Sequence, residues 1–236
     1  MSATTALGRM FAVVLIAALV AAVSALALRP DDRDYPSHVA ATLTVTATGC
    51  RNEEGFGIGT IIEPGLVLTS AHTVLGATRI TVRHNDEEWD AAVVAIDTKN
   101  DLALVEMPMV NIDPMPLIDT ALTIDNAVEQ DGSVVVVRNG AFVTQPATIV
   151  RRVRILTEDA YIDTEVERPG YELRTNIRPG DSGALVVLNG KGVAVVWSRS
   201  RQQDDRAWAI DPVTGGEVLA DHLANGIGAE VDLARC

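Results

Sequence analysis

Aromatic residues are scarce in this 236-residue chain, at 4%, although hydrophobic residues as a whole make up 47%. The core of any folded domain must therefore consist mainly of Val, Ile, Leu and Ala. Basic residues are outnumbered, 19 against 32 acidic ones, which gives a formal net charge of −13. Proteins bind phosphate backbones through clustered Lys and Arg, so nucleic acid is not an expected partner.

Cysteine and histidine are equally sparse, with two and four residues. Cys50 and Cys236 form no C-x-x-C pair, and the histidines are scattered without metal-ligand spacing. We therefore expect no metal and no cofactor. The glycine-rich stretch Gly55–Ile62 is not a dinucleotide-binding fingerprint, because no helical pattern follows it. Glycines in a strand indicate a bend or a close approach of another backbone.

Phe11–Leu28 is a long apolar run in which only Ser24 is polar. Its length lies between that of a signal-peptide core and that of a membrane-spanning helix. Arg9 precedes the run and favours a cytoplasmic N-terminus with export of the remainder. We expect a hydrophobic helix within residues 1–28, acting as a membrane anchor or as a cleaved signal peptide, and a charged linker over residues 29–38.

From residue 39 onward the pattern favours short β-strands separated by turns. In Thr42–Thr48, threonine alternates with Leu, Val and Ala, which is typical of a half-buried strand. Further strands are expected at Leu66–Thr69, Arg79–Arg83, Ala91–Ile96, Asp101–Val105, Ser133–Val137, Thr148–Leu156, Ala184–Leu188, Val193–Trp197 and Ala207–Ile210. Many short strands predict an all-β barrel or sandwich.

Two other segments complete the expected architecture. Met107–Pro116 holds three prolines and is expected to connect two lobes, about residues 39–115 and 130–236. A single helix is predicted near the C-terminus, capped by Asp211 or Thr214 and ending at about Leu223.

Three short motifs contain the candidate catalytic residues. Leu68–Val74 contains His72, Lys99–Val105 contains Asp101, and Arg178–Ala184 places Ser182 between two glycines. Serine is a poor nucleophile unless a base takes its proton, and a histidine oriented by a carboxylate is suited to this role. The chain order is His, Asp, Ser.

These motifs resemble the T-x-A-H-V, D-L-A-L/V and P-G-[DN]-S-G blocks of trypsin-like serine peptidases, especially short bacterial members that are exported or membrane-anchored. The resemblance extends from about Ala40 to the C-terminus. It implies two antiparallel six-stranded β-barrels in a peptidase domain over residues 39–236, with the catalytic triad in the cleft between them. It also implies an extracytoplasmic serine endopeptidase that acts on protein or peptide substrates.

The resemblance gives each motif residue a role. Ser182 is the expected nucleophile, His72 the general base and Asp101 the residue that orients His72. The backbone N–H groups of Gly180 and Ser182 are expected to form the oxyanion hole, because glycine permits the sharp turn that this requires. Asp97 is a rival to Asp101, but the D-L-A-L match favours Asp101, and Asp97 is expected to close a turn.

Asp181 is not expected to be catalytic. In zymogen-activated relatives the matching acid pairs with a newly freed N-terminus, but no R-I-V-G-G-like activation site lies near Ala40. The family pattern places the primary specificity pocket near Asn176, Trp197 and Ser198. A preference for Lys or Arg is not supported, since the residue at 176 is not acidic.

We also expect a disulfide between Cys50 and Cys236, because export would place the domain where disulfides persist and only one intramolecular pairing exists. Two unpaired thiols are the alternative.

Two other functions remain open at this point. An α/β-hydrolase would use Ser182, Asp211 and His222 in that order, although residues 180–184 depart from G-x-S-x-G and strands do not alternate with helices. A catalytically silent trypsin-like barrel could instead serve as a binding module.

Overall fold

The computed structural model describes residues 37–51, 53–122, 129–216, 220–222, 224 and 233. All of them lie in the compact unit Pro36–Cys236. The hydrophobic helix expected at Phe11–Leu28 lies outside the described residues. Within the described ranges, no helix is long and apolar enough to cross a membrane.

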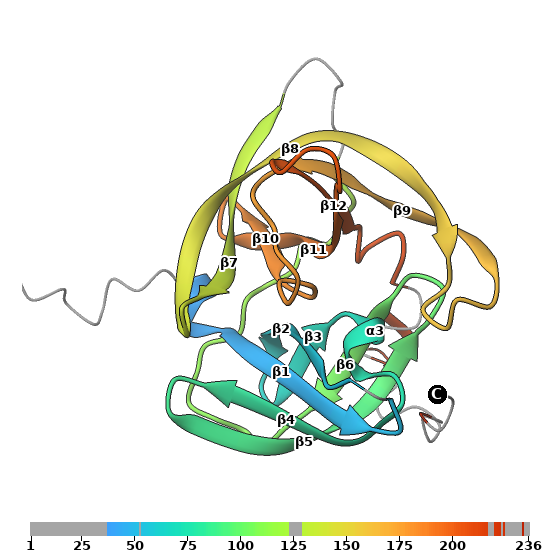
Figure 1. Cartoon of the computed structure of the whole chain (residues 1–236). Helices are drawn as coiled ribbons and strands as arrows, with labels where there is room; N and C mark the ends of the chain where they lie inside the picture. The colour runs from blue at the N-terminus through green and yellow to red at the C-terminus, as the bar shows by residue number, and fades with distance from the viewer. Residues whose placement is uncertain are drawn as a thin grey trace, which may run out of the picture. The chain divides into compact units, whose positions relative to one another are not determined.

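Six antiparallel strands close a first barrel in the order β1-β2-β3-β6-β5-β4 (Figure 1). The strands are β1 Thr42–Gly49, β2 Gly55–Glu63, β3 Leu66–Thr69, β4 Ala77–His84, β5 Glu87–Asp97 and β6 Leu102–Glu106. The alternation predicted for β1 is present, since Leu43, Val45 and Ala47 are buried while Thr44 and Thr46 are partly exposed. The period-2 pattern of this strand therefore sets which of its faces fills the barrel.

Six further strands close a second barrel in the order β10-β11-β12-β9-β8-β7 (Figure 1). They are β7 Gln130–Arg138, β8 Ala141–Glu158, β9 Glu165–Arg174, β10 Leu185–Leu188, β11 Lys191–Arg199 and β12 Arg206–Ile210. The turn expected at Asn189-Gly190 joins β10 to β11, and both residues have positive φ, 51° and 76°. The fold is all-β, with two six-stranded barrels as the resemblance implied.

The two barrels pack directly against each other. Ile58 of β2 belongs to the apolar core of the second barrel, whereas Leu185 and Val195 of the second barrel pack into the core of the first. The connection predicted at Met107–Pro116 contains no strand, and its buried Met115 donates a backbone hydrogen bond to the Ile61 carbonyl. This contact fixes the point from which the chain passes to the second barrel.

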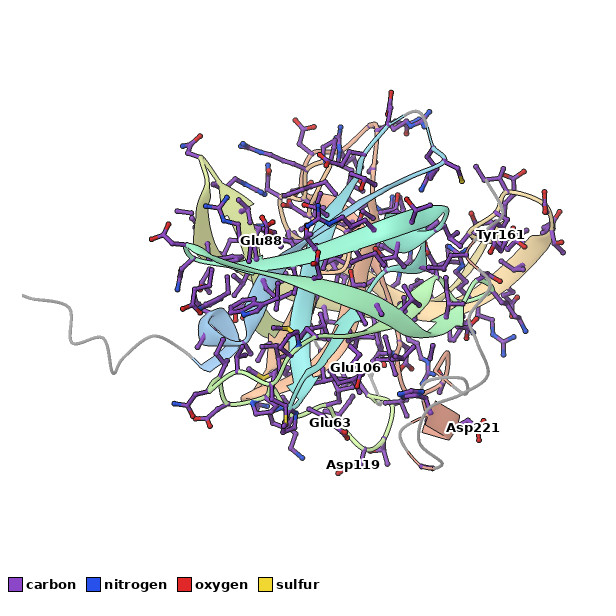
Figure 2. All side chains as sticks on the ribbon, turned by 90° about the horizontal axis from the view of Figure 1, so that it is seen from below. Glu63, Glu88, Glu106, Asp119, Tyr161 and Asp221 are labelled. Atoms are coloured by element: carbon purple, nitrogen blue, oxygen red, sulfur yellow. The ribbon has the colours of Figure 1, made fainter. Side chains whose placement is uncertain are left out.

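Most charged side chains lie on the outside of these barrels, as expected for a solvated acidic protein. Glu63, Glu88, Glu106 and Asp119 are all exposed (Figure 2). Most of the few buried carboxylates lie close to the motif residues, as described below.

Three expectations about secondary structure need correction. Residues Ser37–Ala40 form a short helix, α2, where β structure was predicted from residue 39. Strand β8 begins at Ala141, seven residues before the predicted start, and continues the turn at Asn139-Gly140. Asp211 caps a turn, because its Oδ1 accepts the N–H groups of Val213 and Thr214 before any helix begins.

The predicted C-terminal helix is described only in part. Residues 220–222 and 224 are helical, and Ala220 donates a backbone hydrogen bond to the Gly216 carbonyl. The remainder of that prediction lies outside the described residues.

Candidate active site between two barrels

His72 lies in the one-turn helix α3, Ala71–Val74, which follows the buried strand β3. Hydrogen bonds hold this turn in place: the Ala71 N–H donates to the Asp101 carbonyl at 3.1 Å, and the Ser70 and Thr73 hydroxyls are 2.8 Å apart. The His72 side chain is 35% exposed, so part of its ring is accessible to a ligand.

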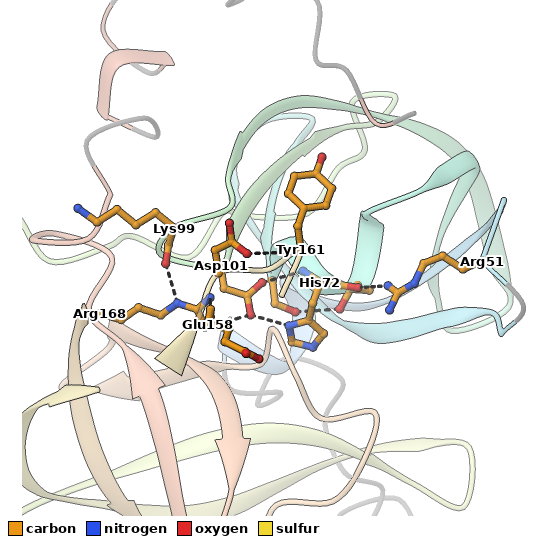
Figure 3. A network of polar contacts seen from close by, with 10 residues as sticks. Arg51, His72, Lys99, Asp101, Glu158, Tyr161 and Arg168 are labelled. Carbon is orange, nitrogen blue, oxygen red and sulfur yellow. Dashed lines mark hydrogen bonds and ion pairs between the residues drawn. The ribbon is translucent and has the colours of Figure 1, made fainter. Parts of the chain in front are cut away.

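Asp101 comes directly before β6, and its side chain is 2% exposed. Its Oδ1 accepts the His72 backbone N–H at 2.7 Å, and its Oδ2 lies 2.7 Å from His72 Nδ1 (Figure 3). When Nδ1 donates to the carboxylate, Nε2 carries the lone pair that a general base needs. The predicted contact between these two residues is therefore present.

Asp97, the rival carboxylate, faces the turn instead. Its two oxygens accept the backbone N–H and the side-chain amide of Asn100, at 2.9 and 2.8 Å. This is the role predicted for it. The turn leads directly into Asp101, whose φ of 58° is uncommon for a residue other than glycine.

Ser182 lies in the loop that joins β9 to β10. Gly180 and Gly183 have φ of 92° and 86°, which glycine adopts without steric cost. The Gly183 N–H donates to the Val196 carbonyl of β11 at 2.9 Å, which fastens the loop to the second barrel. The glycines on each side of the serine are thus used for backbone conformation, as predicted.

The loop directs its N–H groups in two ways. The N–H groups of Asp181, Gly183 and Ala184 all donate hydrogen bonds to backbone carbonyls. Those of Gly180 and Ser182 have no acceptor among the described residues. These two donors are the ones expected to form the oxyanion hole, and they are available to an oxygen of a bound ligand.

Strand β2 connects this loop to α3. The Ser182 carbonyl accepts the Ile58 N–H at 2.8 Å, and the Thr69 hydroxyl donates to the Ile58 carbonyl at 2.8 Å. A Cβ atom at Gly57 would lie 2.6 Å from Thr73 Oγ1 and 2.9 Å from the Ser182 carbonyl oxygen. Only a hydrogen fits there, so the glycine lets α3 and the serine loop approach the same point of β2.

Asp181 is buried and pairs with an arginine from β7. Arg138 makes two hydrogen bonds to the carboxylate, at 2.7 and 2.8 Å, and the Arg178 N–H adds a third at 2.7 Å. Arg138 also donates to the Asn176 carbonyl at 3.1 Å. The acid beside Ser182 therefore has its cation within the chain, where zymogen-activated relatives use a freed N-terminus.

The rival triad with Asp211 and His222 is not supported. Asp211 Oδ2 accepts from Arg152 at 3.0 Å, from the Thr214 hydroxyl at 2.7 Å and from the Tyr171 hydroxyl at 3.2 Å. Burial raises the pKa of Tyr171, so its hydroxyl remains a donor. The Asp211 carboxylate is thus hydrogen-bonded within the second barrel. The two closed barrels also differ from the α/β-hydrolase fold that this triad would require.

The three predicted pocket residues lie on two segments. Asn176 is exposed in the loop after β9, while Trp197 and Ser198 are partly buried in β11. Trp197 packs against the first-barrel core, and the Arg168 guanidinium lies 5.1 Å from its ring. Their role in selecting substrate stays a prediction.

Cys50 comes directly before a residue that contacts the His72 backbone. Its N–H donates to the Gly76 carbonyl at 3.0 Å, and the next residue, Arg51, donates to the His72 carbonyl at 2.7 Å (Figure 3). Cys236 lies outside the described residues, so the disulfide stays a prediction. No group of three or more His, Cys, Asp or Glu in the described part of the chain is arranged to hold a metal ion.

A family model for the trypsin-like peptidase domain matches residues 57–195, more than half of the chain. The chain belongs to the trypsin-like peptidase family. The matched range contains all three motifs. The match begins at Gly57, so it includes Ile58, whose N–H donates to the Ser182 carbonyl.

Known proteins agree with this assignment. The trypsin-like chain is 31% identical over 185 residues to serine protease Rv3671c of Mycobacterium tuberculosis, which covers 76% of this chain and 44% of that protein. It is also 31% identical over 177 residues to a probable periplasmic DegP-like serine endoprotease of Halomonas elongata, covering 72% of this chain and 35% of that one. The chain therefore spans less than half the length of these relatives.

A solved structure extends the likeness to the fold. The active form of the Rv3671c protease superposes with a TM-score of 0.72 at 27% identity, covering 85% of this chain and 87% of that one.

Sequence reasoning missed three basic residues of this trypsin-like site, namely Arg51, Arg138 and Arg168. Each arginine contacts a site group that is at least 21 positions away in the sequence, namely the His72 carbonyl, the Asp181 carboxylate and the Asp101 carboxylate. The one local signal is an arginine at the edge of an apolar strand, as at Arg138 after Val134–Val137. That signal says nothing about which carboxylate the arginine will meet.

Proposed function

We propose that this protein is a serine endopeptidase that hydrolyses peptide bonds in protein or peptide substrates. The observation that carries the proposal is the 2.7 Å contact between Asp101 Oδ2 and His72 Nδ1. It supplies an oriented base close to a loop in which Ser182 is half-buried and the Gly180 and Ser182 N–H groups lack acceptors among the described residues.

The proposed first step forms an acyl-enzyme. Ser182 Oγ attacks the carbonyl carbon while its proton passes to His72 Nε2, and Asp101 stabilises the resulting imidazolium. The carbonyl oxygen becomes an oxyanion that accepts hydrogen bonds from the Gly180 and Ser182 N–H groups. His72 then gives the proton to the leaving amine as the C–N bond breaks.

The second step returns the enzyme to its starting state. Water loses a proton to His72 and attacks the acyl carbon, and Ser182 leaves with the proton that His72 returns to it. Each donor of the oxyanion hole is worth about 3–4 kcal/mol of transition-state stabilisation in serine peptidases. Apart from the attacking water, the proton transfers use only His72 and Ser182 of this chain.

Three variants test the assignment. Ser182→Ala and His72→Ala are expected to lower kcat/KM on a peptide library by about four orders of magnitude or more, with the domain still folded. His222→Ala is the matched control and is expected to keep the parental rate. A His72→Ala protein with parental activity would remove the triad from the proposal.

We extend the proposal to location: the domain acts outside the cytoplasm, anchored by or released from the apolar segment Phe11–Leu28. The support is the apolar length of that segment and the position of Arg9 before it. A reporter that is active only in the cytoplasm, fused after Cys236, is expected to be silent. A fully active reporter would contradict export.

A further inference from the structure

Arg168 of β9 is the largest fully buried side chain among the described residues, with 1% exposure. A buried charge is costly unless hydrogen bonds and opposite charges compensate it. A barrel strand gains nothing from such a residue that an aliphatic side chain would not supply at lower cost. The contacts of this guanidinium are therefore the evidence for its role in the protein.

Those contacts lead to the triad. Nε donates to the Lys99 carbonyl at 2.6 Å, Nη2 donates to the Glu158 carbonyl at 2.8 Å, and Nη1 lies 3.7 Å from Asp101 Oδ2 (Figure 3). The guanidinium also lies over the Trp197 ring. Oδ2 is also the oxygen that lies 2.7 Å from His72 Nδ1. The guanidinium and the imidazole therefore contact the same oxygen of the Asp101 carboxylate.

The same side chain crosses from one barrel to the other. Arg168 belongs to the second barrel, whereas Lys99 and Asp101 belong to the turn before β6 of the first. Close by, the tip of the β8–β9 hairpin makes a parallel connection, since the Ala160 N–H donates to the Thr98 carbonyl at 2.9 Å. The turn that carries Asp101 is thus fastened to the opposite barrel at two points.

The surrounding carboxylates keep the guanidinium charged. Burial lowers the pKa of Arg168, and the carboxylates of Asp101, Asp159 and Asp97 act in the opposite direction. An arginine remains protonated under such opposing effects. These three acids act on the Arg168 guanidinium, Arg51 lies at the His72 carbonyl, and Lys99 and Glu158 contact Arg168 through their backbone carbonyls.

We propose that Arg168 is a positioning residue of the peptidase reaction, which fixes the Asp101 turn and places a positive charge behind the carboxylate that orients His72. This inference rests on the proposed function. The two carbonyl bonds hold the turn in which Asp101 adopts its positive φ. The positive charge lies 3.7 Å from Oδ2, the carboxylate oxygen that contacts His72 Nδ1, so it acts on the same contact.

The variant Arg168→Met removes the charge and keeps much of the volume. We expect kcat/KM to fall about 10- to 100-fold, since a small displacement of a catalytic group has effects of this size. We also expect the acidic limb of the plot of kcat/KM against pH to move to higher pH, because the positive charge beside Asp101 Oδ2 is removed. Arg168→Lys retains the charge and is expected to keep the acidic limb in place while losing part of kcat/KM.

The matched control is Arg152→Met. Like Arg168, Arg152 is a second-barrel arginine paired with a buried aspartate, but its partner Asp211 belongs to the same barrel. This variant is expected to lower the urea midpoint without moving the acidic limb, so a loss of stability alone cannot imitate the result. An unmoved limb and parental kcat/KM in folded Arg168→Met would overturn the inference. If that variant does not fold, a shifted limb in Arg168→Lys would overturn it.

The low-field proton resonance of the His72 Nδ1–H bond separates this inference from the proposed function. It reports the Asp101–His72 contact whether or not peptide is hydrolysed. We expect it in the parental protein and in Arg152→Met, and we expect Arg168→Met to shift or broaden it. An inactive parental protein would contradict the proposed function, whereas an unchanged resonance in folded Arg168→Met would contradict the positioning role.

Discussion

The acid next to Ser182 is held by an arginine of the same barrel. Asp181 is 3% exposed and Arg138 is 17% exposed, so their ion pair is largely removed from solvent. The bidentate geometry and the Arg178 N–H satisfy the carboxylate within one lobe. The loop that carries Ser182 thereby keeps its shape without a free N-terminus in the described part of the chain.

We therefore expect Arg138→Met to be strongly destabilising. Removal of one partner leaves a buried, unpaired carboxylate, which costs about 3–5 kcal/mol of unfolding free energy. Urea unfolding measures this loss, and kcat/KM is expected to fall with it because the serine loop loses its anchor.

Two comparisons check the cause. Arg79→Met breaks a pair with Asp90 whose members are both more than 60% exposed, and it is expected to change stability by about 1 kcal/mol or less. The double variant Arg138→Met with Asp181→Asn is expected to recover part of the stability lost in Arg138→Met. A double variant less stable than Arg138→Met would contradict the ion-pair explanation.

At the scale of elements, the site depends on how closely β2 approaches the serine loop. A Cβ atom at Gly183 would lie 2.1 Å from the Ile58 carbonyl oxygen and 2.6 Å from Thr69 Oγ1. Gly140, in the turn between β7 and β8, has a similar φ of 80° but has no other atom within 4 Å of a Cβ. The two glycines share a backbone conformation and differ in their surroundings.

This pair permits a matched experiment. Both Gly140→Ala and Gly183→Ala incur the roughly 1 kcal/mol cost of an alanine at positive φ. Gly183→Ala is expected to cost about 1–3 kcal/mol more, because β2 must move away from the loop, and to lower kcat/KM about 100-fold. Equal urea midpoints and equal activity for the two variants would contradict close packing of β2 on the loop.

Most strands could be predicted because their pattern is local. The alternation in Thr42–Thr48 and the apolar run Leu66–Thr69 needed no knowledge of their partners, and β1 and β3 match them closely. The start of β8 was missed because residues 141–147 lack that alternation and include Pro146, which weakens a strand prediction. Tertiary pairing with β7 decides that segment, with Ser133 opposite Pro146.

The motif residues were predictable for the same reason, whereas their supporting arginines were not. His72, Asp101 and Ser182 each lie in a short pattern that can be read in isolation. Arg138 and Arg168 act on carboxylates 43 and 67 positions away along the chain. Such contacts arise only when the barrels close and pack, so a pattern within one segment cannot reveal them.

For the whole molecule, the predicted disulfide decides how the C-terminus is held. Cys50 stays beside Gly76 and next to Arg51, which bonds the His72 carbonyl. A disulfide from Cys50 to Cys236 would tie the C-terminus to this part of the first barrel. On a chain-entropy estimate, a loop of this length contributes up to about 5 kcal/mol.

We expect fewer than one reactive thiol per chain in unreduced, denatured protein taken from an oxidising compartment. A thiol reagent such as a maleimide measures this count. After reduction the same assay is expected to give two thiols per chain and a lower urea midpoint. Two thiols before reduction would exclude the pairing.

In the proposed mechanism His72 activates Ser182 for attack, and a fluorophosphonate reagent tests this activation. Such a reagent reacts when the serine oxygen displaces fluoride from phosphorus, which requires the base to take the serine proton. Mass spectrometry of the digested protein is expected to find the adduct on Ser182 in folded parental protein and to find none in His72→Ala or in denatured protein. Folded parental protein that stays unmodified, or that is modified at another serine, would contradict the account and favour a silent binding module.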